Sequence, residues 1–518
     1  MPFVPIRAIG AGGIVTDQAP YDLELQQFPS GNNVAIEDGK IGKALGYSNR
    51  QSLAFQPTHV QGWLYQGNNS LIIGANTAIY RFDGSTVSDV SNASYVGGYS
   101  NSPRWQSAQI GTAVLMNNGS EAPQYMLPDG TAFANLPAWP SNVVTRCIKP
   151  FNSFLVMAGY EELTERYPFT VRWSDEYDPA SVPASWDITS TTNLSGENVL
   201  SGNNGELVDQ LTLNDANIIY AERGVYAMTY VGAPLVFAFR EIFNDDGIVN
   251  RGAVAGFFGK HLVVGQNDIY VHDGNNKQSI VDKRVRRKFF AELRDTRSVF
   301  CQTVPDRSEV WICYADDDSA DTETANRALV YNWAQDAFTF IDLPNVRSLT
   351  LADKMDTSGD WGASPVTWAE SSDYWSNASI TTQGQNIKVF GAGYLNSKIY
   401  QHNDTYGADG TALDAFIEAS KLDLDAVTGG STNTIKQINQ ILPQIEGSGV
   451  ITIKVGVSDS PQAGVQWIAS RDYNIEADHK IDVRASGRYL ALRFESQSSE
   501  DWWKVTGLDI DIRQVAKR

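Results

Sequence analysis

The chain has 518 residues, a formal charge of −20 from 40 basic and 60 acidic side chains, and a pI near 4.7. That length predicts roughly two to four domains, and 42% hydrophobic residues with 13 Trp, 22 Tyr and 21 Phe exclude a disordered chain. No apolar run approaches the ~20 residues of a membrane-spanning helix, and the N-terminal segment lacks a signal-peptide core. We therefore expect a soluble chain that is not exported by that route.

Residues 1–57 are predicted to form an extended segment that joins the repeated part of the chain. From residue 58 to 404, short β-branched or aromatic segments alternate with tight turns. Asp83-Gly84, Asp129-Gly130 and Asp273-Gly274 are hairpin signals, because Gly tolerates the positive φ of such turns. No segment in this range keeps a helical apolar period, so the sequence predicts an all-β protein.

A loose repeat runs through the same part of the chain. Each unit contains an apolar strand, a turn, a strand with Tyr or Trp, a turn such as Asp-Gly, and a polar strand. The units cover residues 59–91, 104–137, 142–188, 205–243, 247–282 and 296–344. Their spacing of about 35–50 residues is typical of four-stranded propeller blades. The repeat predicts a β-propeller body over 58–404 with six blades, or seven if 386–404 adds a closing piece.

The composition and the strand pattern of the sequence change twice after the last repeat unit. Residues 352–384 are polar and rich in Gly and Ser, which indicates a long surface excursion. Residues 405–518 carry alternating strands and predict a C-terminal β-sandwich domain. Within it, 433–447 has apolar residues at helical spacing, but Pro443 lies inside that run and would break a helix, so a strand is favoured.

A search for catalytic and metal-binding motifs gives nothing. The five histidines form no H-x-x-x-H or H-E-x-x-H pattern, and no G-x-S-x-G or nucleotide-binding loop is present. The cysteines Cys147, Cys301 and Cys313 are too few for a disulfide framework, although Cys301 and Cys313 could face each other across a hairpin. We expect buried thiols, no cofactor and no enzyme activity.

Two charged clusters and one aromatic set are candidate sites. An acidic group, joined by Glu323, suits Ca²⁺ ligation or, as we favour, an exposed channel rim; its members are Asp316, Asp317, Asp318 and Asp321. A basic group suits phosphate, an acidic neighbouring subunit or a solvated strand face; its members are Lys283, Arg284, Arg286, Arg287 and Lys288. The aromatic set could stack on sugars or fill a core; its members are Trp361, Trp368, Trp375, Trp502 and Trp503.

Five stretches, in order along the chain, resemble one family. GAGGIVTDQAPYDLELQQFPSGNNVAIEDGKIGKALGY (10–47) has its "GG-x-x-T-D", "N-V-x-x-x-D-G" and "GY" steps, and VRWSDEYDPASVPASWD (171–187) has its "R-W-S-D" element. ERGVYAMTYVGAPLVFAFREIFNDDGIVNRGAV (222–254), ALVYNWAQDAFTFIDLP (328–344) and GRYLALRFESQSSEDWWKVTGLDIDIR (487–513) resemble later elements. The family is the tail nozzle, or tail hub, of short-tailed bacteriophages, which includes proteins like tail-tube protein B.

This resemblance implies a structural protein of the virion, made in the host cytoplasm. It implies a hexameric ring with a β-propeller body that extends the DNA ejection channel below the portal and adaptor proteins. The ring would support tail fibres, spikes or a needle, and DNA would pass without specific binding, which the acidic charge favours. The alternative interpretations are a carbohydrate- or receptor-binding propeller, such as a minor tail protein of a long-tailed phage, and a monomeric propeller that binds protein partners.

Overall fold

The protein is an all-β chain, as the sequence predicts. The computed structural model describes residues 3–65, 68–95, 99, 105–353, 387–425 and 434–517. These residues form eight β-sheets, and the helical elements with described bounds are α1 (Arg286–Glu292) and short 3-10 turns. No helix in the described part of the chain is long and apolar enough to cross a membrane. The predicted excursion at 352–384 lies outside the described residues, apart from its first two.

Five consecutive sheets follow the predicted repeat units. Four of them are meanders of neighbouring antiparallel strands, and in the third β14 and β15 both pair with β16. The first two sheets contain β6 (Pro57–Tyr65), β7 (Asn68–Ala75), β8 (Ile79–Phe82) and β9 (Val87–Asp89), then β10 (Gln106–Ile110), β11 (Ala113–Asn117), β12 (Gln124–Met126) and β13 (Ala134–Asn135). The third contains β14 (Val143–Thr145), β15 (Ile148–Phe151), β16 (Phe154–Glu162), β17 (Glu165–Trp173) and β18 (Gly196–Val199). The fourth and fifth contain β19 (Leu207–Leu213), β20 (Ala216–Ala221), β21 (Val225–Gly232) and β22 (Val236–Phe243), then β23 (Val254–Phe257), β24 (Lys260–Val264), β25 (Ile269–His272) and β26 (Lys277–Ser279).

A seven-stranded sheet follows, and it consists of two halves that share one long strand. Its strands are β27 (Phe300–Val304), β28 (Glu309–Tyr314), β29 (Ala325–Asn332), β30 (Ala337–Asp353), β31 (Ile387–Gly393), β32 (Lys398–His402) and β5 (Tyr47–Ser52). The first part of β30 pairs with β29 and its second part with β31, and between them Asn345 has a φ of 55°. The last half therefore combines the closing piece at 386–404 with an N-terminal strand.

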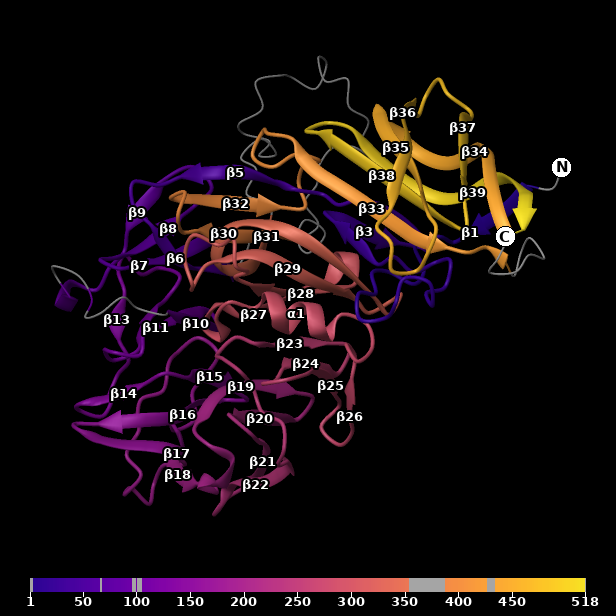
Figure 1. Ribbon diagram of the computed structural model, residues 1–518. Coiled ribbons are helices and arrows are strands. Elements are labelled where there is room, and N and C mark those ends of the chain that lie inside the picture. Colours follow the sequence, from indigo (N-terminus) through magenta and orange to yellow (C-terminus); the bar gives the residue numbers. More distant parts are fainter. Residues whose placement is uncertain are drawn as a thin grey trace, which may run out of the picture.

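These sheets form a closed circle, which we call the sheet circle. Contacts run from β6 to β10, β15, β19, β23, β27 and β30 in turn, and from β30 back to β6. In Figure 1 these strands surround a common centre. Apolar side chains fill the space between neighbouring sheets: Trp63 and Ile72 of the first pack with Val114 of the second, and Val156 of the third with Met228 of the fourth. Each sheet thus buries its faces against the next.

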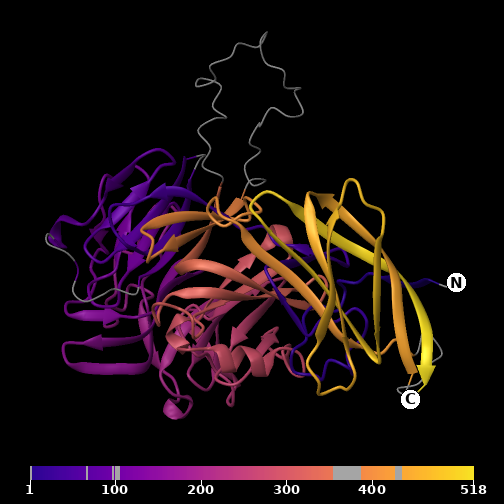
Figure 2. The same cartoon turned by 45° about the horizontal axis from the view of Figure 1, so that its top comes forward.

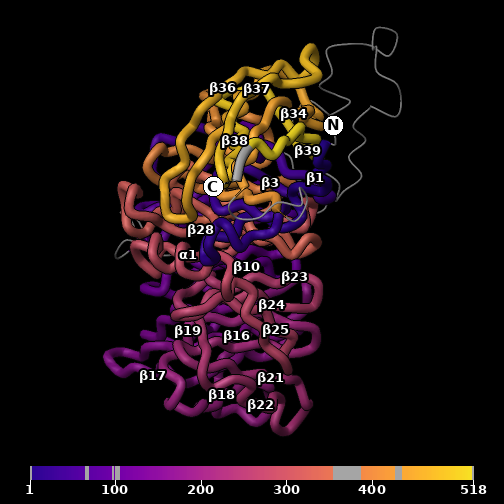
Figure 3. The backbone as a smooth tube through the Cα atoms, turned by 45° about the vertical axis from the view of Figure 1, so that its right-hand side comes forward, coloured from indigo at the N-terminus to yellow at the C-terminus, as the bar shows by residue number. Residues whose placement is uncertain are grey.

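The two remaining sheets, the C-terminal sheets, combine strands from both ends of the chain. One contains β1 (Phe3–Arg7), β3 (Val34–Glu37), β4 (Lys40–Lys43), β34 (Thr434–Ser448), β37 (Ile481–Gly487) and β39 (Trp502–Lys517). The other contains β2 (Ser30–Asn32), β33 (Leu413–Leu422), β35 (Val450–Ser458), β36 (Gln466–Asn474) and β38 (Tyr489–Ser498). Figure 2 shows them beside the sheet circle, and Figure 3 shows β1 and β39 close together, as their pairing requires.

The strand favoured over a helix at 433–447 is confirmed, because it is β34, which pairs with both β39 and β37. Most of the N-terminal segment does not lie in the sheet circle. Its strands β1 to β4 extend the C-terminal sheets, and only β5 joins the circle. Asn33 links the two parts, since its side chain donates to Asp342 Oδ2 and to the Asp414 carbonyl at 2.7 Å each.

Candidate binding cavity at the centre of the sheets

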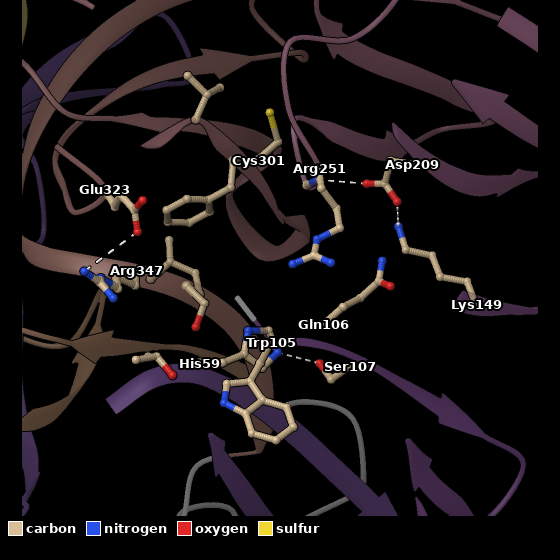
Figure 4. Close-up of a pocket in the computed structure, with 16 residues that line it drawn as sticks. His59, Trp105, Gln106, Ser107, Lys149, Asp209, Arg251, Cys301, Glu323 and Arg347 are labelled. Atoms are coloured by element: carbon tan, nitrogen blue, oxygen red, sulfur yellow. Dashed lines mark hydrogen bonds and ion pairs between the residues drawn. The ribbon is translucent and has the colours of Figure 1, made fainter. Parts of the chain in front are cut away.

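A cavity of about 210 Å³ lies where the first strands of the sheets meet (Figure 4). Residues from all parts of the sheet circle line it. They are Thr58, His59, Trp105, Gln106, Ser107, Lys149, Asp209, Arg251, Gly252, Val299, Phe300, Cys301, Glu323, Arg347, Ser348 and Leu349. The cavity exists because these strands begin near the common centre, and its lining is therefore drawn from residues far apart in the sequence.

The most deeply buried charge of the cavity is the Asp209 carboxylate on β19, which is fully enclosed. Lys149 of β15 forms an ion pair with it at 2.7 Å, and Gly252, just before β23, donates its backbone N–H at 2.8 Å. Burial alone would raise the pKa of Asp209, but the Lys149 charge and the N–H donors outweigh it and lower the pKa below its usual value. One carboxylate thus joins three neighbouring sheets.

Two further polar links lie around the cavity, one between the first two sheets and one within the seven-stranded sheet. His59 of β6 and Ser107 of β10 lie 2.6 Å apart through Nε2 and Oγ, and burial lowers the pKa of His59 to about 3, so the ring is neutral. Arg347 of β30 forms an ion pair with Asp321 at 2.8 Å, approaches Glu323 at 4.0 Å and lies 3.5 Å from the centre of the Tyr394 ring. The polar groups around the cavity are thus paired within the chain, as groups shielded from water require.

Arg251 lies between this cavity and a second one of about 490 Å³, because it lines both. Its guanidinium donates to the Arg146 carbonyl and, in Figure 4, points toward Gln106 and the middle of the cavity. The second cavity runs over the third and fourth sheets. Its charged lining residues are Arg146, Glu161, Arg166, Glu206, Glu222, Arg251 and Arg297.

The predicted acidic rim divides into two parts in the structure. Asp317 and Asp318 are exposed on the loop between β28 and β29, whereas Asp316 is buried. Asp316 accepts a hydrogen bond from Asn326 at 2.6 Å and lies 3.6 Å from Arg327. Asp321, the fourth member, is paired with Arg347. Among the described residues, no group of three or more His, Cys, Asp or Glu is placed to hold a metal ion.

The predicted basic cluster lies at α1 rather than on a strand face. Three of its members form ion pairs within the chain: Arg284 with Asp336 at 2.6 Å, Arg286 with Asp282 at 3.9 Å, and Lys288 with Glu292 at 2.9 Å. Lys283 and Arg287 are exposed.

The aromatic and cysteine predictions are resolved in part. Trp361, Trp368 and Trp375 lie outside the described residues, Trp503 is fully buried and Trp502 stacks against Tyr406. The three cysteines are free thiols. Cys301 pairs in register with Ile312 and Cys313 with Phe300, so the two cysteines project from opposite faces of their sheet.

The sequence did not single out Lys149, Asp209 or Arg251. Each is a single charge next to or within an apolar strand, and such charges carry no motif. The available signal was the charge itself, because Asp209 is the only charged residue of LVDQLTL and Lys149 follows the buried Ile148 in a short strand.

The comparisons with known proteins identify no relative. A scan against models of known protein families finds no match, and neither does a search of curated proteins.

Proposed function

We propose that the chain is a structural protein of the virion, the subunit of the tail nozzle or hub ring of a short-tailed bacteriophage. In this proposal the sheet circle is a seven-bladed β-propeller and the C-terminal sheets form a β-sandwich. Six copies form a ring that extends the DNA ejection channel below portal and adaptor and anchors fibres, spikes or a needle. The proposal assigns no catalytic role. The ordered sequence resemblance from residue 10 to 513 supports it.

The observation that carries the proposal is a pair of exposed apolar surfaces at opposite ends of the molecule (Figure 1). On the turn between β21 and β22, Val231 and Leu235 are 53% and 72% exposed. On β36, the edge strand of its sheet, Trp467 and Ile468 are 40% and 52% exposed. Exposed apolar groups and open strand edges favour association. Two different surfaces that meet head to tail generate a closed ring when the rotation closes.

The charge of the chain suits a conduit for DNA. Six copies at −20 each would carry about −120, and an acidic channel repels a polyanion and prevents it from adhering. Asp317 and Asp318, the exposed members of the acidic cluster, are the candidates for its rim.

The test is native mass spectrometry with negative-stain imaging, first on the purified 56.9 kDa chain and then with a portal–adaptor complex. We expect a species of about six subunits with a central hole in at least one condition. The double variant Trp467→Ser, Ile468→Asp should abolish it. The matched control Leu163→Asp, at a 75% exposed residue on another turn, should not. A single copy in both conditions would contradict the proposal.

A carbohydrate- or receptor-binding propeller is the second candidate, and the central cavity favours it. This function predicts a single copy in solution that binds to a glycan array. The nozzle function predicts assembly whether or not a glycan binds.

A further inference from the structure

Two strands, β22 and β36, form long open edges of their sheets. Each is the last strand of its sheet, and in the described part of the chain no other strand pairs with its outer edge. β22 has eight residues and β36 has nine. The outer strands of the first, second, third and fifth sheets, β9, β13, β18 and β26, have only two to four. A short edge limits unwanted pairing, whereas a long one offers its N–H and C=O groups to another strand.

Exposed charges of opposite sign lie side by side in the sequence of both strands. Arg240 and Glu241 are neighbours on β22, and Arg471 and Asp472 are neighbours on β36. All four side chains belong to exposed residues. Each edge therefore carries one positive and one negative group that a second strand would meet.

The contacts of these groups within the chain leave them able to bind a partner. Glu241 accepts a hydrogen bond from Asn204 through Oε1, and Asp472 accepts one from Thr452 through Oδ1, at 2.9 Å each. Each bond uses one carboxylate oxygen, so the other oxygen can accept from a guanidinium. Arg471 donates one N–H to the carbonyl of the residue before it at 3.3 Å, and a guanidinium has five such donors.

The order of the charges selects one register for a pairing between the two edges. An antiparallel register that places Arg240 opposite Asp472 also places Glu241 opposite Arg471. A slip by one residue brings the two arginines together in one direction and the two carboxylates together in the other. A parallel arrangement cannot form both opposite-charge pairs. Opposite charges across a strand pair are stabilising and like charges are destabilising, so the charges favour this antiparallel register.

We propose that β22 of one copy of the chain pairs with β36 of the next copy in this register, so that one continuous sheet crosses the interface. The inference rests on the proposed ring function, because it names the strands that join neighbouring subunits. Figure 1 shows β22 and β36 at opposite ends of the molecule, so each copy has one edge for each of two neighbours. Trp467 and Ile468, at the start of β36, then meet the end of β22 at the half-buried Ile242 and Phe243, which covers apolar surface.

The test is analytical sedimentation of the full chain, alone and with a portal–adaptor complex, with these charges reversed and exchanged. Arg240→Glu and Asp472→Arg should each weaken association by about tenfold or more, because each places like charges opposite one another. The double variant Arg240→Glu, Asp472→Arg carries the exchanged pair and should associate within about threefold of the original chain. The control Arg484→Glu, at an exposed residue of the edge strand β37, should leave association unchanged.

A cysteine pair tests the register directly. Cα atoms of opposite residues in antiparallel strands lie about 4.5–5.5 Å apart, within the span of a disulfide. The variant Arg240→Cys, Asp472→Cys should therefore form disulfides between copies on oxidation, and Arg240→Cys, Arg484→Cys should not. If a charge variant does not fold, as judged by thermal melting, this cross-link decides.

The outcomes separate the strand pairing from the ring. A ring that the single charge variants do not weaken, or that the double variant does not restore, overturns the strand pairing and leaves the nozzle function. Pairs or open chains of copies that depend on these charges support the strand pairing and contradict the ring. Copies that stay single in both conditions contradict both.

Discussion

The sheet circle and the C-terminal sheets are built in opposite ways. In the circle nearly every strand pairs with its neighbour in the sequence, and polar links across sheets lie at the centre. In the C-terminal sheets β1 pairs with β39, almost the whole chain apart, and β2 pairs with β33. Sheets made of strands that are neighbours in the sequence therefore need contacts between sheets to hold them together. In the C-terminal sheets, the strand pairing itself joins distant parts of the chain.

The two parts also differ in their buried ionisable groups. The circle contains all four of the histidines with buried rings and lowered pKa values, His59, His261, His272 and His402. The fifth, His479, is exposed in the C-terminal part. In that part Lys43 is instead buried against the Ser498 carbonyl at 2.6 Å, and burial lowers its pKa to about 8. Protonation of these histidines should therefore destabilise the sheet circle and leave the C-terminal sheets folded.

Removal of the Asp209 carboxylate should break the circle at its polar centre. Asp209→Ala leaves Lys149 and the Gly252 N–H without their buried acceptor, and loss of one partner of a buried pair costs about 3–5 kcal/mol. We expect this fall in the free energy of unfolding in urea titrations, with proteolysis beginning in the third to fifth sheets. The control Asp215→Ala, exposed on the next turn, should stay within about 0.5 kcal/mol. A loss under about 1 kcal/mol would mean that apolar packing alone joins the sheets.

Acid should weaken the circle through a buried hydrogen-bond chain. Tyr220 Oη lies 2.7 Å from both His261 Nδ1 and His272 Nε2. Gly274 donates its N–H to His272 Nδ1, so Nε2 carries the proton and donates to Tyr220. Tyr220 then donates to His261 Nδ1, and His261 Nε2 donates to the Thr212 carbonyl. Both rings must be neutral to keep every bond.

The lowered pKa values of His261 and His272 define the pH range over which the circle loses stability. Burial lowers the pKa of His261 to about 4 and of His272 to about 3, below the ordinary 6.5. At a pH between the folded-state pKa of each histidine and 6.5, the unfolded chain binds more protons than the folded chain does. The stabilisation from the neutral histidines is therefore complete above pH 6.5 and is lost as the pH falls toward 4. Each histidine should cost roughly 2 kcal/mol between pH 7 and 5. We expect His261→Gln, His272→Gln to reduce the slope of unfolding free energy against pH by about half, because His59 and His402 have similarly lowered pKa values and still contribute. His479→Gln should leave the slope unchanged. A slope that is not reduced in the double variant would assign the acid sensitivity elsewhere.

The sheet circle was predictable because its information is local. Tight turns and short apolar strands lie within each unit, and Gly84 and Gly274 have φ values of 97° and 91°, as two of the predicted hairpins require. The third prediction was wrong in this respect, because Gly130 does not have a positive φ. The second half of the seven-stranded sheet, which closes the circle, was harder to predict. It needs β5, which is separated from β32 by most of the chain, and nothing in YSNRQS shows which sheet it joins.

The cavity was less predictable than the fold. Clusters of charged residues form a recognisable sequence pattern, whereas single charged residues such as those of the cavity do not. The acidic run at 316–321 predicts an exposed rim, yet Arg327 and Arg347 approach two of its carboxylates. Those arginines lie in strands where sequence gives no distance to the loop. Asp209 and Arg251 are brought together by closure of the circle, which is a tertiary event. Whether Asp317 and Asp318 face a channel stays a prediction.

Substitution of two glycines tests whether the sheet circle and the C-terminal sheets fold independently of each other. We expect the smallest losses of stability from these substitutions. A Cβ at Gly62 would run into the Leu351 carbonyl oxygen, where β6 meets β30 and the circle closes. A Cβ at Gly42 would run into the Trp503 carbonyl oxygen, where β4 meets β39. Neither contact can be relieved by turning a side chain, because both involve backbone, so each substitution to Ala should cost about 1–3 kcal/mol.

The two variants should differ in where the loss falls. Hydrogen exchange should accelerate in the first and last sheets of the circle for Gly62→Ala, and in the C-terminal sheets for Gly42→Ala. Gly464→Ala, where a Cβ meets nothing within 4 Å, should change neither. If both variants accelerate exchange throughout the chain, the circle and the C-terminal sheets unfold as one cooperative unit. In that case the N-terminal strands, which run from β1 through the C-terminal sheets to β5, are the connection that couples them.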